Sequence, residues 1–286
     1  MILIADSGSS KTDWILIKDN QLIENIVTPG INPFFQQTED IVKMLSVVFS
    51  PEIRDQKVEI YFYGTGCIKN ESDSVIINAL NTIFPYATIE VEDDMLGAAR
   101  SLLGHQEGIA CIIGTGSNSC RYDGEKIIDK VPTLGYILGD EGSGAYLGKI
   151  FLNNYFKRSI PADMKAIVDS ELNLEVPKVL SAVYKGEYPS RYLASFSRFI
   201  IKNGNHPYMT ALLKGGFEAF LSNNVEKYSD YKSIPVNFVG SIAFYYADLL
   251  RDVANEKNIR IDRILHKPIE GLIEYHISTK NKKGKE

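Results

Sequence analysis

The chain has 286 residues, of which 44% are hydrophobic, and a formal net charge of −5 at pH 7. This length and apolar content suffice for two hydrophobic cores, so two domains are expected. The negative charge, spread along the chain, argues against a nucleic-acid surface, and no apolar window approaches the length of a membrane-spanning helix. No targeting segment is recognisable, so we expect a cytoplasmic protein without a nucleic-acid or membrane partner.

The first half of the chain reads as alternating strands and helices. Apolar and β-branched runs predict three consecutive strands at residues 2–5, 13–18 and 21–28. The elements expected after them are a helix at 33–48, a strand at 58–63, a helix at 72–84, a strand at 88–92 and a helix from residue 95. The resulting order is three strands followed by alternating helices and strands, which indicates an α/β domain.

A similar run restarts near Gly108. The elements expected there are strands near 109–113, 119–122 and 125–129, helices at 142–155, 161–172, 177–185, 188–203 and 206–227, a strand at 235–239 and a helix at 242–253. No low-complexity linker separates the halves, which are therefore expected to pack around a shared cleft. We predict domains at residues 1–107 and 108–272 and a C-terminal segment at 273–286.

The turn after the first strand has the sequence DSGSSKT, beginning at Asp6. A Walker A loop would need glycine immediately before Lys11, where Ser10 stands, and a helix after it, where β-forming residues follow. The segment is therefore interpreted as strand, tight turn and strand, with Asp6 at the end of the first strand.

This hairpin has a second copy further along the chain. Residues 110–119 (ACIIGTGSNS) match the form of residues 2–11 (ILIADSGSSK) without a gap, at an offset of 108. Each copy is an apolar strand followed by a turn of small residues. Two such hairpins could hold one nucleotide between them, because backbone N–H groups free of bulky side chains form anion-binding nests.

Two acidic positions at strand ends suggest chemistry on phosphate. Asp6 would either cap its own turn or hold the Mg²⁺ that accompanies phosphate, largely through water. In the acidic turn after the strand at 88–92, Asp93 can be the N-cap of the next helix. Asp94 is then available to accept the proton of a substrate hydroxyl, as aspartate bases do in other kinases.

A third acidic site is the pair Asp140 and Glu141, which stands between glycines ahead of an apolar helix. One interpretation is an N-cap stabilised by the helix dipole. The other is ligand binding, because flanking glycines allow close approach of a ligand and paired carboxylates suit bidentate hydrogen bonding to sugar hydroxyls.

Five short motifs together resemble a known family. They are DSGSSKTD from Asp6, DMLGA from Asp94, GTGSN from Gly114, GDEGS from Gly139 and VGSIA from Val239. In this order they are similar to the signatures of N-acetylglucosamine kinase-like members of the BadF/BadG/BcrA/BcrD ATPase family, which belongs to the sugar kinase, heat-shock chaperone and actin superfamily. The resemblance extends to about residue 272. It implies an α/β fold of two RNase H-like (actin-like ATPase) domains, each with a mixed βββαβα core, around a nucleotide cleft.

The resemblance also implies roles for individual residues. The cofactors would be ATP and Mg²⁺. Asp94 would be the catalytic base, and Asp6 would be the Mg²⁺ ligand. The implied ATP-binding residues are Gly8, Ser9, Ser10, Lys11, Gly114, Thr115, Gly116 and, against the adenosine, Gly240. The implied sugar-binding residues are Asn32, Asn118, Asp140 and Gly144. The C-terminal helix would pack back on the first domain, and the protein would be a homodimer.

The implied activity is ATP-dependent phosphorylation of an amino sugar. The substrate would be N-acetylglucosamine, at its 6-hydroxyl, or a relative such as glucosamine or N-acetylmuramic acid. Two alternatives are an ATPase coupled to a partner protein and a sugar-binding regulator without catalysis. The cysteines, Cys67, Cys111 and Cys120, match no iron–sulfur pattern of the dehydratase activators in the same family, which weighs against that branch. The first loop also departs from the family, because serines replace some of its usual glycines.

Overall fold

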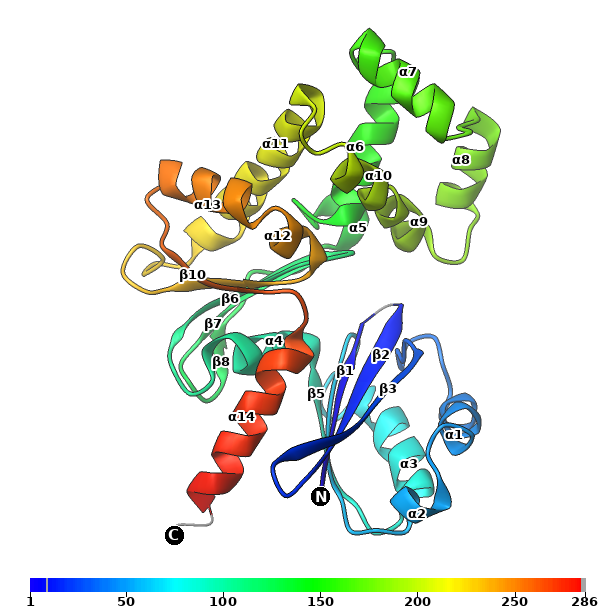
Figure 1. Ribbon diagram of the computed structural model, residues 1–286, viewed down its shortest axis with the longest axis vertical. Coiled ribbons are helices and arrows are strands. Elements are labelled where there is room, and N and C mark those ends of the chain that lie inside the picture. The colour runs from blue at the N-terminus through cyan, green and yellow to red at the C-terminus, as the bar shows by residue number, and fades with distance from the viewer. Residues whose placement is uncertain (9, 284–286) are drawn as a thin grey trace. The chain divides into compact units, whose positions relative to one another are not determined.

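The computed structural model describes residues 1–8 and 10–283. Ser9, one of the predicted ATP-binding residues, lies outside the described residues. The chain forms two compact units (Figure 1). The first consists of residues 1–106, 124–126 and the segment from Lys267 onward, and the second of residues 107–123 and 127–266. In the described part of the chain, no helix is both long and apolar enough to cross a membrane.

The first unit is built on one five-stranded sheet. Its strands, in the order β3-β2-β1-β4-β5, are β1 (Ile2–Ser7), β2 (Lys11–Lys18), β3 (Gln21–Pro29), β4 (Glu59–Gly64) and β5 (Thr88–Asp93). Its helices are α1 (Thr38–Ser46), α2 (Pro51–Arg54), α3 (Asp73–Ile83), α4 (Asp94–Leu103) and α14 (Pro268–Lys283). Strands β1 to β3 pair antiparallel, whereas β4 and β5 run parallel to β1.

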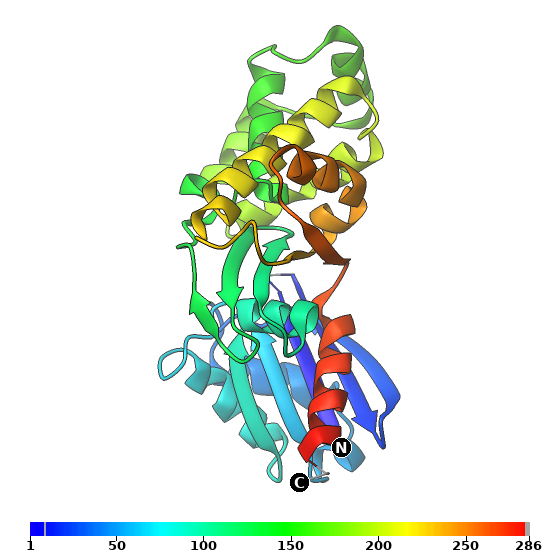
Figure 2. The same ribbon diagram turned by 90° about the vertical axis from the view of Figure 1, so that its left-hand side faces the viewer.

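Strand β1 is apolar at successive positions because both faces of the sheet are covered. Leu3 and Ala5 face a core that includes Ile41 of α1 and Leu80 of α3. The alternate residues pack in a second cluster against α14, whose members are Ile2, Ile4, Ile15, Ile17, Tyr63, Ile269 and Leu272. Helix α14 also packs along α4, as Figures 1 and 2 show.

A buried polar network ties α14 to α4 and the sheet. Arg100 of α4 donates to the Tyr63 hydroxyl (2.8 Å) and to Glu90 Oε1 (2.7 Å). The Tyr63 hydroxyl is also 2.9 Å from Nε2 of His276 in α14. Burial, with a smaller contribution from nearby Arg100, lowers the pKa of His276 to about 3, so the ring is neutral in the folded protein at pH 7.

The second unit repeats the same sheet. Its strands, in the order β10-β9-β6-β7-β8, are β6 (Gly108–Ile113), β7 (Ser117–Tyr122), β8 (Ile127–Asp129), β9 (Val236–Val239) and β10 (Ile261–Leu265). Strands β6 to β8 pair antiparallel, and β9 and β10 run parallel to β6. Each unit therefore contains three antiparallel strands followed by two parallel ones, which confirms the predicted α/β class and the internal duplication.

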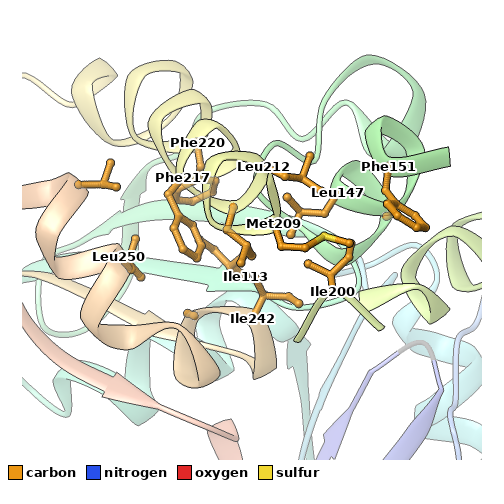
Figure 3. Close-up of a cluster of buried hydrophobic side chains, with 14 of the residues drawn as sticks. Ile113, Leu147, Phe151, Ile200, Met209, Leu212, Phe217, Phe220, Ile242 and Leu250 are labelled. Carbon is orange, nitrogen blue, oxygen red and sulfur yellow. The ribbon is translucent and has the colours of Figure 1, made fainter. Parts of the chain in front are cut away.

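Most helices of the second unit follow β8 and precede β9 in the sequence. The helices are α5 (Gly135–Leu138), α6 (Gly144–Phe156), α7 (Ala162–Glu171), α8 (Val176–Tyr184), α9 (Pro189–Ser195), α10 (Ser197–Lys202) and α11 (Pro207–Asn223), with a 3₁₀ turn at Val225–Lys227, and then α12 (Ser241–Tyr245) and α13 (Ala247–Glu256). Figure 3 shows how side chains of α6, α10, α11, α12 and α13 meet over Ile113 of β6. This core holds β6, and with it the turn that follows, in place.

Several elements differ from the sequence-based expectation. The helix predicted at 33–48 begins only at Thr38, because Asn32 closes a local turn through its side chain, which accepts from Phe34 N (2.9 Å). The predicted helices at 188–203 and 242–253 are each two helices, which meet at Phe196 and Tyr246. Strand β10 was not predicted.

Candidate active site

In the first unit, three strands end at the same edge of the sheet. Strands β1, β4 and β5 are parallel, and Ser7 pairs with Gly64, which in turn pairs with Asp93. Polar groups that follow these strands therefore lie near one another, as is typical of ligand sites in open α/β sheets.

Asp94 is the first residue of α4 and directly follows β5. Asp93 is the N-cap of this helix, because its Oδ1 accepts from Leu96 N (2.7 Å), which confirms the predicted cap. Thr65, directly after β4, donates its hydroxyl to Asp94 Oδ2 at 2.6 Å. The sequence predicts no catalytic role for Thr65, although a small-residue turn after a strand, Gly64-Thr65-Gly66, marks its position.

The carboxylate of Asp6, near the end of β1, has a strongly perturbed pKa. Burial, Asp13 and Asp94, in that order, raise it to about 7, against the opposing charges of Lys11 and Lys267. Asp13 is the cross-strand partner of Asp6 in β2. Asp13 is itself ion-paired with Lys11 (2.8 Å) and Lys267 (3.4 Å). Carboxylates crowded in this way favour a bound cation.

This arrangement fits a magnesium site with few protein ligands. Among the described residues, no group of three or more His, Cys, Asp or Glu side chains could hold a metal ion. Asp6 would therefore be a single protein ligand, and water and phosphate oxygens would complete the coordination, as is common for Mg²⁺. The raised pKa of Asp6 fits this role, because a divalent cation would stabilise the charged form.

The turn between β1 and β2 is shorter than predicted. Gly8 N donates to Lys11 O (3.0 Å), and Lys11 is already the first residue of β2, so its ammonium group belongs to the strand and not to the turn. Ser10 lies in the turn and is exposed. Only Gly8 and Ser10 of the described ATP-binding candidates therefore occupy the turn itself.

Asn32 lies beside the turn that contains Thr65. Its backbone N–H donates to Gln36 Oε1 (2.9 Å), so the residue is held by its own loop. Gly66 has φ +83°, and a Cβ there would be 2.7 Å from Asn32 Oδ1. The side chain of Asn32 therefore lies against Gly66, two residues after the end of β4.

In the second unit, the turn after β6 is closed by the start of α6. Gly114 N donates to Gly116 O (2.9 Å), and Gly144 N and Ala145 N donate to Gly114 O (2.8 Å) and Thr115 O (3.0 Å). The turn is closely packed here, because a Cβ on Gly144 would lie 3.3 Å from Ala194. The predicted residues Gly114, Thr115, Gly116 and Gly144 are therefore in one place.

Asp140 lies over this turn. Its Oδ1 accepts from Ser117 N (3.3 Å), and a Cβ on Gly116 would be 3.0 Å from Asp140 Oδ2. Burial raises the pKa of Asp140. The N-cap of α6 is Ser143, which accepts from Tyr146 N (3.2 Å), so the capping interpretation of Asp140 is wrong.

Asp140 also lines a cavity of about 250 Å³ within the second unit. Its lining residues are Ser117, Val131, Pro132, Thr133, Leu134, Gly139, Asp140, Glu141, Asn223 and Asn224. A cavity of about 610 Å³ between α5, α6, α8 and α9 is lined mainly by apolar side chains and contains none of the predicted site residues. The polar cavity at Asp140 is therefore the better candidate for a hydroxylated ligand.

Gly240 is the N-cap of α12 and directly follows β9. Its φ is +122°, its N–H donates to Leu265 O (3.1 Å), and a Cβ there would be 2.4 Å from Ile113 O. Only glycine fits so close to the end of β6. Asn118, in β7, uses Oδ1 locally to accept from Ser119 N (2.9 Å).

The predicted residues therefore form two clusters, one in each unit. The first contains Asp6, Gly8, Ser10, Lys11, Asn32 and Asp94. The second contains Gly114, Thr115, Gly116, Asn118, Asp140, Gly144 and Gly240. Two sheets of one topology with such clusters at the ends of their central strands define a class, the duplicated RNase H-like fold of actin-like ATPases and sugar kinases.

Comparisons with known proteins narrow the class to a family. The chain is 41% identical to an inferred N-acetylglucosamine kinase of Porphyromonas gingivalis, over 96% of this chain and 98% of that one, with a TM-score of 0.90. The chain therefore belongs to the family of N-acetylglucosamine kinase-like proteins, which confirms the resemblance. No protein-family model and no curated protein matches it.

More distant structures agree on the fold. An inferred N-acetylglucosamine kinase of Chromobacterium violaceum is 16% identical, over 96% of this chain and 98% of that one, with a TM-score of 0.74. A ROK family glucokinase of Streptomyces griseus, in complex with glucose and AMPPNP, is 13% identical, over 95% and 96%, with a TM-score of 0.52. Such matches cover the whole duplicated architecture and confirm two RNase H-like units.

Proposed function

We propose that the protein is an ATP-dependent carbohydrate kinase that phosphorylates an amino sugar. The first candidate substrate is N-acetylglucosamine, at its 6-hydroxyl, followed by glucosamine and N-acetylmuramic acid. One observation carries the proposal: in a chain 41% identical to an inferred N-acetylglucosamine kinase, Asp6 and Asp94 lie close together at the carboxyl ends of the parallel strands β1 and β5.

Asp94 would act as the general base. Its carboxylate would accept the proton of the sugar hydroxyl as that oxygen forms a bond to the γ-phosphorus and the bond to the β-phosphate oxygen breaks, releasing ADP. The position of Asp94 supports this role, because a side chain on the first residue of a helix at a strand end is held by the backbone of both elements.

Asp6 and the two lysines would serve the phosphates. Mg²⁺ held near Asp6 would neutralise charge that develops on the transferred phosphoryl group. The ammonium groups of Lys11 and Lys267 lie at the same strand end and share Asp13 as their partner. Exposed Ser10 and the backbone of Gly8 would face the phosphates from the turn, and Thr115 would do so from the second unit.

Asp140 would bind the sugar from the second unit. A carboxylate accepts hydrogen bonds from adjacent hydroxyls, and the polar cavity of about 250 Å³ beside it suits a small hydrophilic ligand. Gly144 and Asn118 lie on the elements next to this turn. Gly240, at the end of β9, would lie against the adenosine. None of these proposed roles depends on the predicted homodimer.

An ADP-release assay tests the proposal. MgATP would be offered with N-acetylglucosamine, glucosamine, N-acetylmuramic acid, glucose or no sugar, using the wild type, Asp94→Asn and Asp93→Asn. We expect release that depends on one amino sugar, a loss of about 10²–10⁴-fold in kcat for Asp94→Asn, and near-normal kcat for Asp93→Asn. Asn preserves the helix cap, so Asp93→Asn is the matched control.

Other outcomes point to the alternatives. ADP release without sugar would favour a partner-coupled ATPase, and sugar binding without release would favour a regulator. Near-normal turnover of Asp94→Asn would show that another group accepts the proton.

A further inference from the structure

We infer that Thr65 is a positioning residue for Asp94, which holds the carboxylate in the orientation needed for proton transfer. The inference rests on the proposed kinase function. Its main observation is the 2.6 Å hydrogen bond from the Thr65 hydroxyl to Asp94 Oδ2. A hydroxyl that donates to a carboxylate at this distance makes one of the stronger hydrogen bonds in proteins.

The backbone of Thr65 is fixed by the centre of the sheet. Its N–H donates to Ser7 O (3.1 Å), the last residue of β1. Ser7 is buried, and its own hydroxyl contacts Thr12 Oγ1 (2.8 Å) and Ile31 O (2.9 Å). Thr65 is therefore anchored to the same strand that carries Asp6.

The turn around Thr65 has little conformational freedom. A Cβ on Gly64 would lie 2.5 Å from the Phe62 ring, and Gly66 needs its positive φ to turn the chain toward Cys67, whose N–H donates to Gly64 O (3.2 Å). Threonine is also stiff at χ1, because it is branched at Cβ. The hydroxyl is therefore presented from a nearly rigid position.

The backbone of Asp94 is equally well fixed. The N-cap Asp93 holds the first turn of α4, and a Cβ on Gly97 would be 2.8 Å from Tyr63, so the helix lies directly on the sheet. What remains adjustable is the rotation of the Asp94 side chain. The bond from Thr65 restricts that rotation, which favours a reactive geometry over other rotamers.

Three variants test this inference in the sugar-dependent ADP-release assay. Thr65→Val keeps the shape but loses the hydroxyl, and Thr65→Ser keeps the hydroxyl. Thr28→Val, which removes the acceptor for Trp14 Nε1 (3.0 Å), is the matched control for loss of a structural threonine hydroxyl in the same unit. Thermal unfolding and the KM for MgATP are measured for each variant.

We expect Thr65→Val to lower kcat about 10–100-fold while the KM for MgATP stays within about twofold, and Thr65→Ser to recover at least half of that loss on a logarithmic scale. Thr28→Val should lower the unfolding temperature with near-normal kcat.

The inference is overturned if Thr65→Val turns over as the wild type does, or if Thr65→Ser is as impaired as Thr65→Val. It is also overturned if Thr65→Val changes kcat only as far as Thr28→Val does at equal loss of stability. If the wild type shows no sugar-dependent ADP release, the proposed kinase function itself is overturned. If the wild type shows this release and Thr65→Val shows it at the same rate, only the role of Thr65 is overturned.

Discussion

The β1–β2 turn of the first unit and the β6–β7 turn of the second follow strands of the same length and place in the sheet but have different surroundings. The end of β1 is charged, with Asp6 and Asp13 opposed by Lys11 and Lys267. The end of β6 is covered by main chain. There Gly144 N and Ala145 N hydrogen-bond the turn.

This difference shows that a duplicated fold does not by itself determine the chemistry at its strand ends. The strands and their order are kept, while the chemistry at the strand ends depends on segments that arrive later in the chain. In the first unit that segment supplies an ammonium group, from Lys267, and in the second it supplies the carboxylate of Asp140 over Gly116. We therefore expect the charged end of β1, with Asp6, to hold the metal and Asp140, which lies over the second turn, to bind the sugar, while both turns face the phosphates.

The largest expected effect separates these two roles. Asp6→Asn should lower kcat/KM for MgATP on the order of 10²–10³-fold with little change in sugar affinity, because it removes the charge that attracts Mg²⁺. Asp140→Asn should raise the KM for the sugar about 10–100-fold instead, because an amide replaces an acceptor-only carboxylate. Both KM values are measured at saturating co-substrate.

Asparagine suits both positions as a control for shape. It is isosteric with aspartate and tolerates the positive φ of +55° at Asp140. If both variants raised the same KM, the separate roles assigned to Asp6 and Asp140 would be wrong.

The second expected effect concerns stability. Gly240→Ala should reduce the free energy of unfolding by about 3 kcal/mol, because the new Cβ would be 2.4 Å from Ile113 O at a φ that alanine rarely adopts. Gly8→Ala should cost less than about 1 kcal/mol, since its nearest neighbour would be Lys11 O at 3.9 Å. Denaturant unfolding measures both.

Gly215→Ala provides a third point for this series. Gly215 lies inside α11 with no atom within 4 Å of an added Cβ, so alanine should stabilise by about 0.5–1 kcal/mol. Equal losses in Gly240→Ala and Gly8→Ala would mean that Gly240 is packed no more tightly than Gly8.

A third expected effect is a pH dependence of the metal-free protein. The pKa of Asp6 is about 7 in the folded state against an ordinary value of 3.8. Between these values the folded state keeps a proton that the unfolded state releases, so this group's contribution to stability is lost as pH rises through that window. A pKa difference of this size predicts a loss of about 2–3 kcal/mol of stability between pH 5 and pH 7.5.

Chemical unfolding in EDTA at both pH values, for the wild type and Asp6→Asn, isolates this contribution. His276 contributes with the opposite sign, because its pKa of about 3 means that stability is lost as pH falls below 6.5. Subtracting the free energies of unfolding of the two proteins cancels the contribution of His276. If the stability of the wild type changed with pH just as that of Asp6→Asn does, the raised pKa of Asp6 would be contradicted.

Local patterns sufficed to predict much of the fold. Neighbouring residues alone determine the apolar run of β1, the small-residue turns and the cap at Asp93. Both hairpins and the start of α4 could therefore be predicted. The ungapped match between the hairpins was misleading in detail. Strands β1 and β6 begin 106 residues apart, at residues 2 and 108, and not at the offset of 108 that letter matching suggests.

Features that depend on distant partners could not be predicted in this way. Strand β10 contains Asp262 and Arg263 and has a register shift between Ile261 and Ile264, so no apolar alternation marks it. It exists because it pairs with β9. The bond from Thr65 to Asp94 likewise joins residues that only the parallel arrangement of β4 and β5 brings together, as sheet pairing is not a local property.

Helix α14 has a consequence for the order in which the protein is made. One face of the first sheet, with Ile2 and Ile4 on it, is completely covered only when residues 268–283 have left the ribosome, because α4 alone does not replace the contacts of Ile269 and Leu272. Almost all of the second unit is translated before these residues. The earliest part of the chain is therefore the last to be finished. A nascent chain stalled before Pro268 would leave part of this apolar sheet face exposed, a surface of the kind that chaperones bind.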